Sequence, residues 1–333
     1  MKVLLAGHWN WEIYEEAFKN GLKANGHDVV KFSFSDYYNN MWFKKLQIRL
    51  KVGPLIKLIN QELISAVNFN NPDILFMHQS DLIFPKTIRK IKKLNVNIKV
   101  KIYHNDNPYR GIRNALKWRH FLATIRTADH LFVYRPENVA DGRRLGCNSI
   151  SIIMPSYVSY LHYPVFEDKE KIIDVIFVGH FEPDGRDEYI DFLKQNGVNV
   201  EVYGTGWTNS GYNWAKSESI RLLGAEEYTK ILSSAKIALV FLSKINRDVW
   251  TRRCFEITAC RTLMMAQRTS DLEKIWSDGV EAIFFDSKED LLRKTLDLLQ
   301  KNDEIYNIAS CGYVRCISYG NSEIDRSRQI IED

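Results

Sequence analysis

Short apolar runs alternate with longer helical patterns along the whole chain, and this alternation limits the possible fold more than any other feature. The run KVLLAG (2–7) ends in glycine, and the next segment, 10–26, places Ile13, Ala17 and Leu22 on one helical stripe before Gly26. Glycine is common just past a helix end. Repeated strand–helix units of this kind predict an α/β fold with parallel sheets covered by helices on both faces.

The strand patterns fall into two series, separated by an irregular segment rich in proline and tyrosine. The first series continues at 27–34, 73–79, 97–106 and 129–135, and the second comprises 173–180, 199–204, 236–243, 262–267 and 281–286. Helices are expected in the gaps, among them 225–235 and 288–301. A chain of 333 residues is also longer than one core usually organises. We therefore predict two doubly wound, Rossmann-like domains at 1–160 and 161–320, with a linker near 155–170 and a cleft at their facing strand ends.

The composition is that of a soluble globular protein, and it excludes several classes of function. No apolar run approaches the roughly 18 residues that span a bilayer, and no secretory signal is visible at the start, so a cytoplasmic location is expected. The five cysteines are never spaced CxxC, which argues against zinc and a disulfide framework. The first strand–helix turn lacks the GxGxxG pattern, which disfavours a nicotinamide or flavin enzyme.

Two segments of the first half, 43–57 and 85–101, are basic with interleaved apolar residues. Two interpretations are open. Each segment could be a solvated helix face, or it could contact an anionic membrane surface or an anionic acceptor. Nucleic acid is a less suitable partner, because the net charge is only +5 and no nucleic-acid-binding motif is present.

Two residues of the first half are candidate catalytic bases. His8 follows the first strand at its carboxyl end, where open α/β sheets place functional groups, and histidine is easily poised as a base near neutral pH. A structural or acceptor-shaping role for His8 is the alternative. Asp106 lies in a cluster of polar and turn residues after another strand, where it either caps the local backbone or faces an acceptor. It has no second carboxylate two residues away, so it forms no DxD metal motif.

Glycine-rich turns follow the first two strands of the second series. In 178–189, Gly179 and His180 precede Arg186, which lies near a helix start, where phosphate is favoured electrostatically. Gly204 and Gly206 repeat the pattern after the next strand. Either turn alone is weak evidence, because such turns occur in any α/β protein.

The stretch DVWTRRCFEITACR (248–261) is the strongest candidate for a ligand site. Arg252 and Arg253 lie within one helical turn of Glu256, and Asp248 precedes Glu256 by eight residues. An ion pair on a solvated face would explain the charges, but the flanking residues are nearly all apolar. Arginines at a helix start favour a diphosphate, whereas a carboxylate can accept ribose hydroxyls and a second one hexose hydroxyls.

Several ordered segments resemble the GT-B-fold glycosyltransferases, in particular the CgeB-like members related to glycosyl transferase group 1. They are HNDNP (104–108), DVIFVGH (174–180) followed by Arg186, VYGTGW (202–207), RCFEITACRTLMMAQ (253–267), LEKIWSDGVEAIFFDSKEDL (272–291) and the tail IASCGYVRCISYGNSEIDR (308–326). The resemblance covers the chain well from about residue 100 to the end. It indicates the GT-B fold and the superfamily, but not a substrate.

The resemblance implies a role for each matched residue. Glu256 would hold the nucleotide ribose, Asp248 would lie near the donor sugar, and Arg253 would contact the diphosphate. The sequence departs from the family at Arg261, where the family usually has glycine, and at Ser322, where threonine is more frequent. Such enzymes usually need no metal or other cofactor, because arginines and helix N-termini stabilise the diphosphate. The fold also implies a last helix, 321–333, that packs back toward the first domain.

The sequence thus predicts a glycosyltransferase whose domain 1–160 binds a glycan, lipid-linked or protein acceptor and whose domain 161–320 binds a nucleotide diphosphate sugar such as a UDP-sugar. Synthesis of bacterial surface polysaccharide, with peripheral contact at the inner face of an anionic membrane, is the expected setting. A GT-B sugar-nucleotide epimerase and a non-catalytic nucleotide-sugar binding protein are the alternatives. Inversion and retention at the anomeric carbon are both open.

Overall fold

The structure, a computed structural model, describes residues 1–38, 42–109, 115–166 and 171–333, and these form two compact units. The first unit contains 1–154 together with 323–333, and the second contains 155–322. The first unit ends at Met154 rather than at residue 160, because Tyr157 bonds through its N–H to the Asn321 carbonyl and the Ser156 carbonyl accepts a hydrogen bond from Arg252. Residues 110–111 of the polar turn and 167–170 of the expected linker lie outside the described part of the chain.

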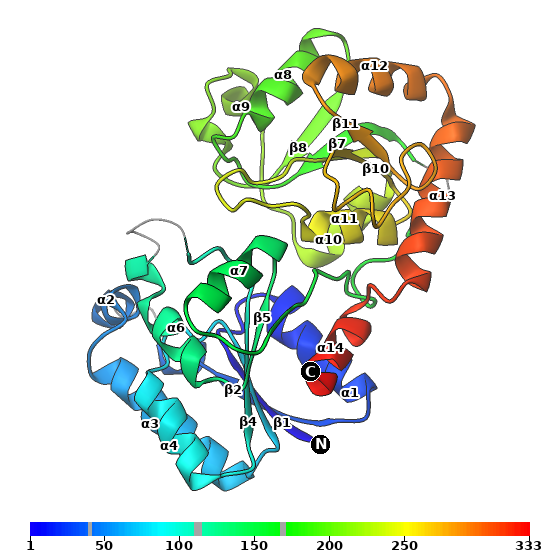
Figure 1. The fold of residues 1–333 in the computed structure, drawn as a ribbon. Helices are drawn as coiled ribbons and strands as arrows, with labels where there is room; N and C mark the ends of the chain where they lie inside the picture. Colours follow the sequence, from blue (N-terminus) through cyan, green and yellow to red (C-terminus); the bar gives the residue numbers. More distant parts are fainter. Residues whose placement is uncertain (39–41, 110–114, 167–170) are drawn as a thin grey trace. The chain divides into compact units, whose positions relative to one another are not determined.

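The first unit is built on a parallel sheet with the strand order β2-β1-β3-β4-β5-β6 (Figure 1). Its strands are β1 (Lys2–Gly7), β2 (Asp28–Ser33), β3 (Ile74–His78), β4 (Lys99–His104), β5 (His130–Val133) and β6 (Ile150–Ile152). Five of them match predicted strands. The sixth, β6, has only three half-buried residues and therefore lacks the apolar run that marks the others.

Helices cover both faces of this sheet. They are α1 (Ala17–Ala24), which follows a π-helical turn (Glu12–Glu16), α2 (Trp42–Leu50), α3 (Pro54–Asn70), α4 (Pro85–Leu94), α6 (Arg119–Thr124), α7 (Pro136–Arg144) and α14 (Glu323–Glu332). Alternate residues of the strands, such as Leu4, Leu75 and Val100, pack on α3 and α4. Residues of the opposite parity, such as Phe76, face α1, where Phe18 meets the ring of Phe76.

The last helix, α14, belongs to the first unit and packs against α1 (Figure 1). A Cβ on Gly21 of α1 would lie 2.5 Å from the Glu323 carbonyl oxygen, so the two backbones approach closely. The Asn25 amide donates to the Ile324 carbonyl (2.8 Å), and the buried Lys101 ammonium donates to the Ile330 carbonyl (2.8 Å). The end of the chain therefore completes the core of its first unit.

The second unit contains a parallel sheet with the order β11-β10-β9-β7-β8. Its strands are β7 (Ile173–Val178), β8 (Val200–Tyr203), β9 (Ala235–Val240), β10 (Leu263–Gln267) and β11 (Ile283–Phe285), and its helices are α8 (Arg186–Gln195), α9 (Trp214–Ser217), α10 (Ala225–Ser233), α11 (Arg252–Ala259), α12 (Lys288–Leu299) and α13 (Asn302–Ser318). Helices α8 and α12 cover one face of the sheet, whereas α10 and α11 lie on the other (Figure 1). Two parallel, doubly wound sheets confirm the predicted α/β, Rossmann-like architecture.

Each sheet reverses its winding direction once, and this point positions the candidate residues. Strand β1 lies between β2 and β3, and β7 lies between β8 and β9. In open α/β sheets, ligands bind outside the carboxyl ends of the strands at such a switch point. No helix in the described part of the chain is long and apolar enough to cross a membrane.

Candidate active site

His8 lies directly after β1, at the switch point of the first sheet. Its Nε2 is 2.9 Å from Asp81 Oδ1, and its Nδ1 is 3.1 Å from the Tyr38 hydroxyl. Asp81 follows β3, the strand next to β1. Because an ionised carboxylate only accepts hydrogen bonds, Nε2 carries the proton and Nδ1 keeps the lone pair. The pair thus has the geometry of a histidine base oriented by a carboxylate.

A buried lysine holds the other oxygen of the same carboxylate. Lys51 Nζ lies 2.6 Å from Asp81 Oδ2 and 4.5 Å from the centroid of the Trp118 ring. Lys51 is 6% exposed, and burial lowers the pKa of its ammonium group despite the neighbouring Asp81. Asp81 is therefore fixed from two sides, with one oxygen directed to His8 and the other to Lys51.

The environment makes His8 a stronger base. Burial alone would lower the pKa of His8, but the hydrogen bond from its ring to Asp81 and the Asp81 charge outweigh that effect, so the pKa is raised. Burial likewise opposes ionisation of Asp81, yet His8 and Lys51 hold the pKa of its carboxyl well below the usual range. The dyad therefore contains a permanent carboxylate and an imidazole that titrates above its ordinary pH.

Asp106 is half-buried and lies beyond the end of β4. The carboxylate that contacts His8 is Asp81, not Asp106. Its N–H donates to His104 Nδ1 (3.2 Å), which caps the local turn. The buried ring of His104 lies edge-on to Trp118 and Phe121. Burial lowers the pKa of His104 well below its usual range, so this imidazole stays neutral. No contact between Asp106 and His8 is present in the described part of the chain, and a catalytic role for Asp106 stays a prediction.

A second carboxylate supports the turn that carries His8. Glu15 Oε1 accepts a hydrogen bond from the His8 N–H (2.8 Å) and lies 2.9 Å from His78 Nδ1. Burial raises the pKa of Glu15, but the His78 charge and hydrogen bond dominate and lower it to about 2. A Cβ on Gly7 would lie 2.4 Å from Glu15 Oε1, so Gly7 is required for this close packing.

In the second unit, two of the predicted glycines pack against each other. Gly204 has φ +137°, and a Cβ there would lie 2.1 Å from the Gly179 carbonyl oxygen. This contact joins the loops after β7 and β8. Gly206 has φ +80° and precedes the short 3₁₀ turn Trp207–Asn209. The glycines thus fix the shape of the strand-end loops, and a direct role in donor binding stays a prediction.

The loops after β7 and β9 meet at the switch point of the second sheet. His180 has a side chain that is 58% exposed, and its Nε2 lies 3.0 Å from Glu182 Oε1. The Ser243 hydroxyl donates to the other oxygen of Glu182, and the Ser243 carbonyl accepts the Asp248 N–H (3.0 Å). Burial raises the pKa of Glu182, but the hydrogen bonds from His180 and Ser243 and the Arg186 charge lower it to about 2. His180 and Asp248 are therefore linked through Glu182 and Ser243.

Arg186 begins α8, as predicted, but its side chain is turned into the loop. The buried guanidinium donates to both oxygens of Asp184, at 2.8 and 2.5 Å, and to the His180 carbonyl at 2.9 Å. These contacts favour a role in holding the β7–α8 loop together. A contact between Arg186 and a phosphate stays a prediction.

Helix α11 carries the predicted arginines at its N-terminus. All residues of this helix are described, and the side chain of its N-cap residue, Thr251, accepts no hydrogen bond from the N–H groups of the first turn. The half-buried Arg253 guanidinium lies over Gly179, where a Cβ would be 2.9 Å from Nη2. Arg252 points elsewhere and donates to the Ser156 carbonyl (2.8 Å). A helix N-terminus and a guanidinium beside a glycine at a strand end form an arrangement suited to an anion.

Glu256 lies one turn further along α11 and is only 5% exposed. The Tyr228 hydroxyl donates to Glu256 Oε2 (2.6 Å), and His162 Nε2 lies 3.7 Å from Oε1. Burial and the Glu256 charge raise the pKa of Tyr228 far above its usual range, so the phenol remains a donor. A solvated ion pair with Arg252 or Arg253 is therefore not the explanation for this carboxylate.

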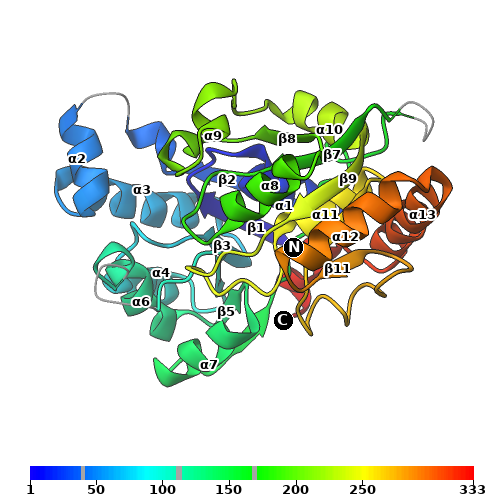
Figure 2. The same ribbon diagram turned by 90° about the horizontal axis from the view of Figure 1, so that it is seen from above.

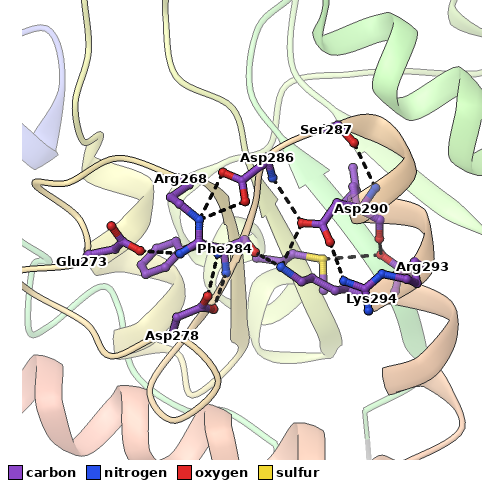
Figure 3. A network of polar contacts seen from close by, with 12 residues as sticks. Arg268, Glu273, Asp278, Phe284, Asp286, Ser287, Asp290, Arg293 and Lys294 are labelled. Carbon is purple, nitrogen blue, oxygen red and sulfur yellow. Dashed lines mark hydrogen bonds and ion pairs between the residues drawn. The ribbon is translucent and has the colours of Figure 1, made fainter.

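Asp248 lines a cavity of about 270 Å³ at the carboxyl ends of β9, β10 and β11. The cavity is lined by Leu242, Ser243, Lys244, Arg247, Asp248, Gln267, Arg268, Phe285 and Asp286. Figure 3 shows that Arg268 on its wall points into a group of carboxylates and contacts Asp278 (2.7 Å), Asp286 (3.0 Å) and Glu273. Through these ion pairs, Arg268 connects the loops at the ends of β10 and β11 and has a structural role.

Sequence reasoning missed Asp81, Lys51, Tyr228 and Glu182. Asp81 and Glu182 both follow predicted strands within a few residues, so strand-end position was a signal that could have found them. Lys51 and Tyr228 gave no such signal. Each lies on or beside a helix, and the carboxylate that it contacts is about 30 residues away in the sequence. Among the described residues, no three histidine, cysteine, aspartate or glutamate side chains are grouped so that they could hold a metal ion.

Comparison with known proteins agrees with this geometry. The family model described as glycosyl transferase-like matches residues 186–332, which include α11. This part of the chain is similar to glycosyltransferase domains. The predicted GT-B fold and the predicted resemblance to glycosyltransferases are therefore confirmed, whereas the CgeB-like subgroup stays a prediction.

Solved structures with the same fold cover essentially the whole chain. Sucrose-phosphate synthase from Thermosynechococcus elongatus and HepE from Anabaena in complex with UDP and glucose each have a TM-score of 0.66 and 13% identity, covering 100% of this chain and 98% of theirs. A glycosyltransferase from Rickettsia africae has a TM-score of 0.67 and 12% identity, covering 99% and 97%. None of the curated protein sequences matches the chain significantly.

Proposed function

We propose that this protein is a glycosyltransferase that moves a sugar from a nucleotide diphosphate sugar to a glycan, lipid-linked or protein acceptor. The observation that carries the proposal is helix α11. Its N-terminus lacks a side-chain cap, Arg253 lies over Gly179, and Glu256 is a buried carboxylate held by Tyr228. In the proposal, the N-terminus and Arg253 bind the diphosphate, and Glu256 accepts the ribose hydroxyls.

The proposed donor site needs no metal and no other cofactor. Positive groups on the protein would stabilise the charge that develops on the departing diphosphate, which is the role that a divalent cation has in other transferases. Asp248, which lines the cavity at the carboxyl ends of β9, β10 and β11, would accept hydroxyls of the donor sugar. Activity that is unchanged after treatment with a chelator is the expected result.

The His8–Asp81 pair supports an inverting reaction. In that reaction, His8 Nδ1 takes the proton of the acceptor hydroxyl, the acceptor oxygen bonds to the anomeric carbon, and the bond from that carbon to the diphosphate breaks. The Tyr38 hydroxyl lies 3.1 Å from Nδ1, a distance that supports this nitrogen as the acceptor of a hydroxyl proton. A product with the inverted anomeric configuration is expected, as measured by NMR of the linkage.

The proposed setting is the cytoplasm, at the inner face of a bacterial membrane, in the synthesis of surface polysaccharide. The basic segments 43–57 and 85–101 support contact with an anionic surface. UDP is the first nucleotide to test, because the similar HepE structure holds UDP and glucose.

A screen of UDP-, GDP-, dTDP- and CMP-sugars by thermal shift, followed by product analysis, tests the function. Stabilisation by one sugar nucleotide, and sugar transfer only when an acceptor is added, would support it. An epimerised sugar nucleotide formed from the donor alone would instead indicate the epimerase. Donor binding without turnover, together with tolerance of His8→Ala, would indicate a non-catalytic binding protein.

A further inference from the structure

Helix α2 carries an unusual amount of exposed apolar surface. None of its residues, all of which are described, is buried. Trp42, Leu46 and Leu50 are 76%, 46% and 50% exposed. They recur at every fourth position and therefore form one strip along the helix. Single exposed apolar residues are normal, but a strip that begins with tryptophan and continues over two turns marks an interaction surface.

Positive charge lies beside this strip. Lys45 and Arg49, four residues apart and both exposed, form the neighbouring strip on the outer face of α2. The inner face, by contrast, holds the half-buried Lys44, Gln47 and Ile48. The outer face of the helix is thus divided into an apolar half and a basic half, which is the pattern of a helix that lies in a membrane interface.

A basic groove lies on the neighbouring helices α3 and α4 of the same unit. Helix α2 packs on α3, and α3 packs on α4, as both views show (Figures 1 and 2). A groove of about 310 Å³ between α3 and α4 is lined by the ammonium-bearing residues Lys57, Lys86 and Lys90, together with the apolar Phe84 and Ile64. On α4 itself, Ile88 and Ile91 are buried, so this helix presents charge but no apolar strip.

We propose that the outer face of α2 and the groove between α3 and α4, together called the α2–α4 surface, dock the protein on an anionic membrane. Trp42, Leu46 and Leu50 would enter the interfacial layer, while the lysines and Arg49 bind lipid phosphates. Charge complementarity selects this occupant. A second copy of the chain would place like-charged strips against each other in a two-fold contact, which is unfavourable.

Helix α2 is connected to the His8–Asp81 pair by a series of hydrogen bonds within the first unit. Arg119 donates to the Leu50 carbonyl, His120 Nε2 lies 2.8 Å from the Lys51 carbonyl, and Lys51 bonds Asp81. If the proposed transfer reaction is correct, this connection favours an acceptor that is itself anchored in the membrane. Docking itself does not depend on that reaction.

Co-sedimentation of the full chain with vesicles, without donor or acceptor, tests the proposal. We expect binding to vesicles that contain phosphatidylglycerol, weakening as salt rises, and little binding to phosphatidylcholine alone. The double variant Lys45→Gln/Arg49→Gln should bind roughly thirtyfold more weakly, at about 1 kcal/mol per basic residue. The variant Trp42→Ala/Leu46→Ala should also lose most binding.

Two matched controls change exposed residues elsewhere in the first unit. Phe69→Ala removes an aromatic side chain that is 88% exposed on α3, and Lys23→Gln removes an exposed charge on α1. Both should bind vesicles like the unmodified chain. Because none of the altered side chains is buried, thermal unfolding should be unchanged in every variant.

Equal binding of the α2 variants and the controls, or equal binding to both kinds of vesicle, would overturn the proposal. A dimer that dissociates in Trp42→Ala/Leu46→Ala would show that the surface pairs with a second copy instead. Titration with UDP is measured separately on the same proteins. A failure of membrane docking is therefore distinguishable from a failure of the proposed donor site.

Discussion

At the scale of single residues, the candidate chemistry depends on carboxylates that the fold holds in one orientation. Asp81 is fixed between His8 and Lys51, and Glu256 is fixed by Tyr228. Neither carboxylate is free to rotate toward water. Such preorganisation is what a base dyad and a hydroxyl-binding carboxylate require.

The first prediction concerns the pH dependence of transfer. His8 must be neutral to accept a proton, and Asp81 raises its pKa, so kcat/KM should fall as the pH drops through a value above 6.5. In Asp81→Asn the charge that raises the pKa is lost, so the acid limb should move to lower pH while the maximal rate falls. A pH–rate profile of both proteins measures this. An acid limb that does not move would show that Asp81 does not act through His8.

The second prediction concerns Tyr228, whose phenol is buried against Glu256. Tyr228→Phe removes one hydrogen bond to a charged group, so the protein should lose about 1.5–3 kcal/mol of unfolding free energy. If Glu256 binds the ribose, KM for the donor should rise as well, with a smaller effect on kcat. Tyr212→Phe, at a half-buried tyrosine in a loop of the same unit, is the control. Denaturant unfolding and donor kinetics give the two quantities, and an unchanged KM would assign Tyr228 a purely structural role.

At the scale of elements, the strand-end loops rely on backbone contacts that only glycine permits. Gly204 faces the Gly179 carbonyl, and the turn after α11 places Arg261 at φ +52°. The resembled family usually has glycine at that last position. In this chain a residue with a long side chain therefore adopts the left-handed conformation at the turn that leads into β10.

The third prediction compares two glycines with positive φ. Gly204→Ala combines backbone strain with a clash against the Gly179 carbonyl, and we expect a loss of more than about 2 kcal/mol in unfolding free energy. Gly185→Ala, at φ +96° with no atom within 4 Å of the added carbon, should lose only about 1–2 kcal/mol. Chemical denaturation of both variants decides the matter. Equal losses of unfolding free energy in the two variants would mean that the backbone moves away from the Gly179 carbonyl without loss of stability.

The sequence predicted the elements better than their contacts. Nearly all strands were found, because each is an apolar run ended by glycine or polar residues, and β6 was missed because it is short and half-buried. The local pattern of 248–261 located helix α11 correctly, whereas the role of Glu256 stays a prediction. The pattern could not show that Arg252 turns to Ser156 while Arg253 lies over Gly179, because those partners are set by tertiary packing.

At the scale of the whole molecule, the chain forms two units, and the first is closed by the last helix. Helix α14 covers α1 and receives hydrogen bonds from Asn25 and Lys101. The two ends of the sequence thus share one core, although the second unit lies between them in the sequence.

The fourth prediction is that deletion of 323–333 weakens the first unit selectively. The deletion exposes α1 and leaves the buried Lys101 ammonium without the Ile330 carbonyl. Hydrogen exchange should therefore rise in β1, α1 and β4, with little change in β7, β9 and α11. Mass spectrometry of peptic fragments gives this map. A uniform rise in both units would contradict the assignment of α14 to the first unit alone.

The central claim is that helix α11 binds a nucleotide diphosphate, and isothermal titration with UDP and GDP tests it most directly. The account predicts that Arg253→Ala and Glu256→Gln each weaken binding of the preferred nucleotide at least about tenfold, the loss of one charge-assisted contact. Arg293→Ala, which removes an exposed cation on α12, should leave the affinity unchanged. Unchanged affinity in both α11 variants, with folding intact, would contradict the account.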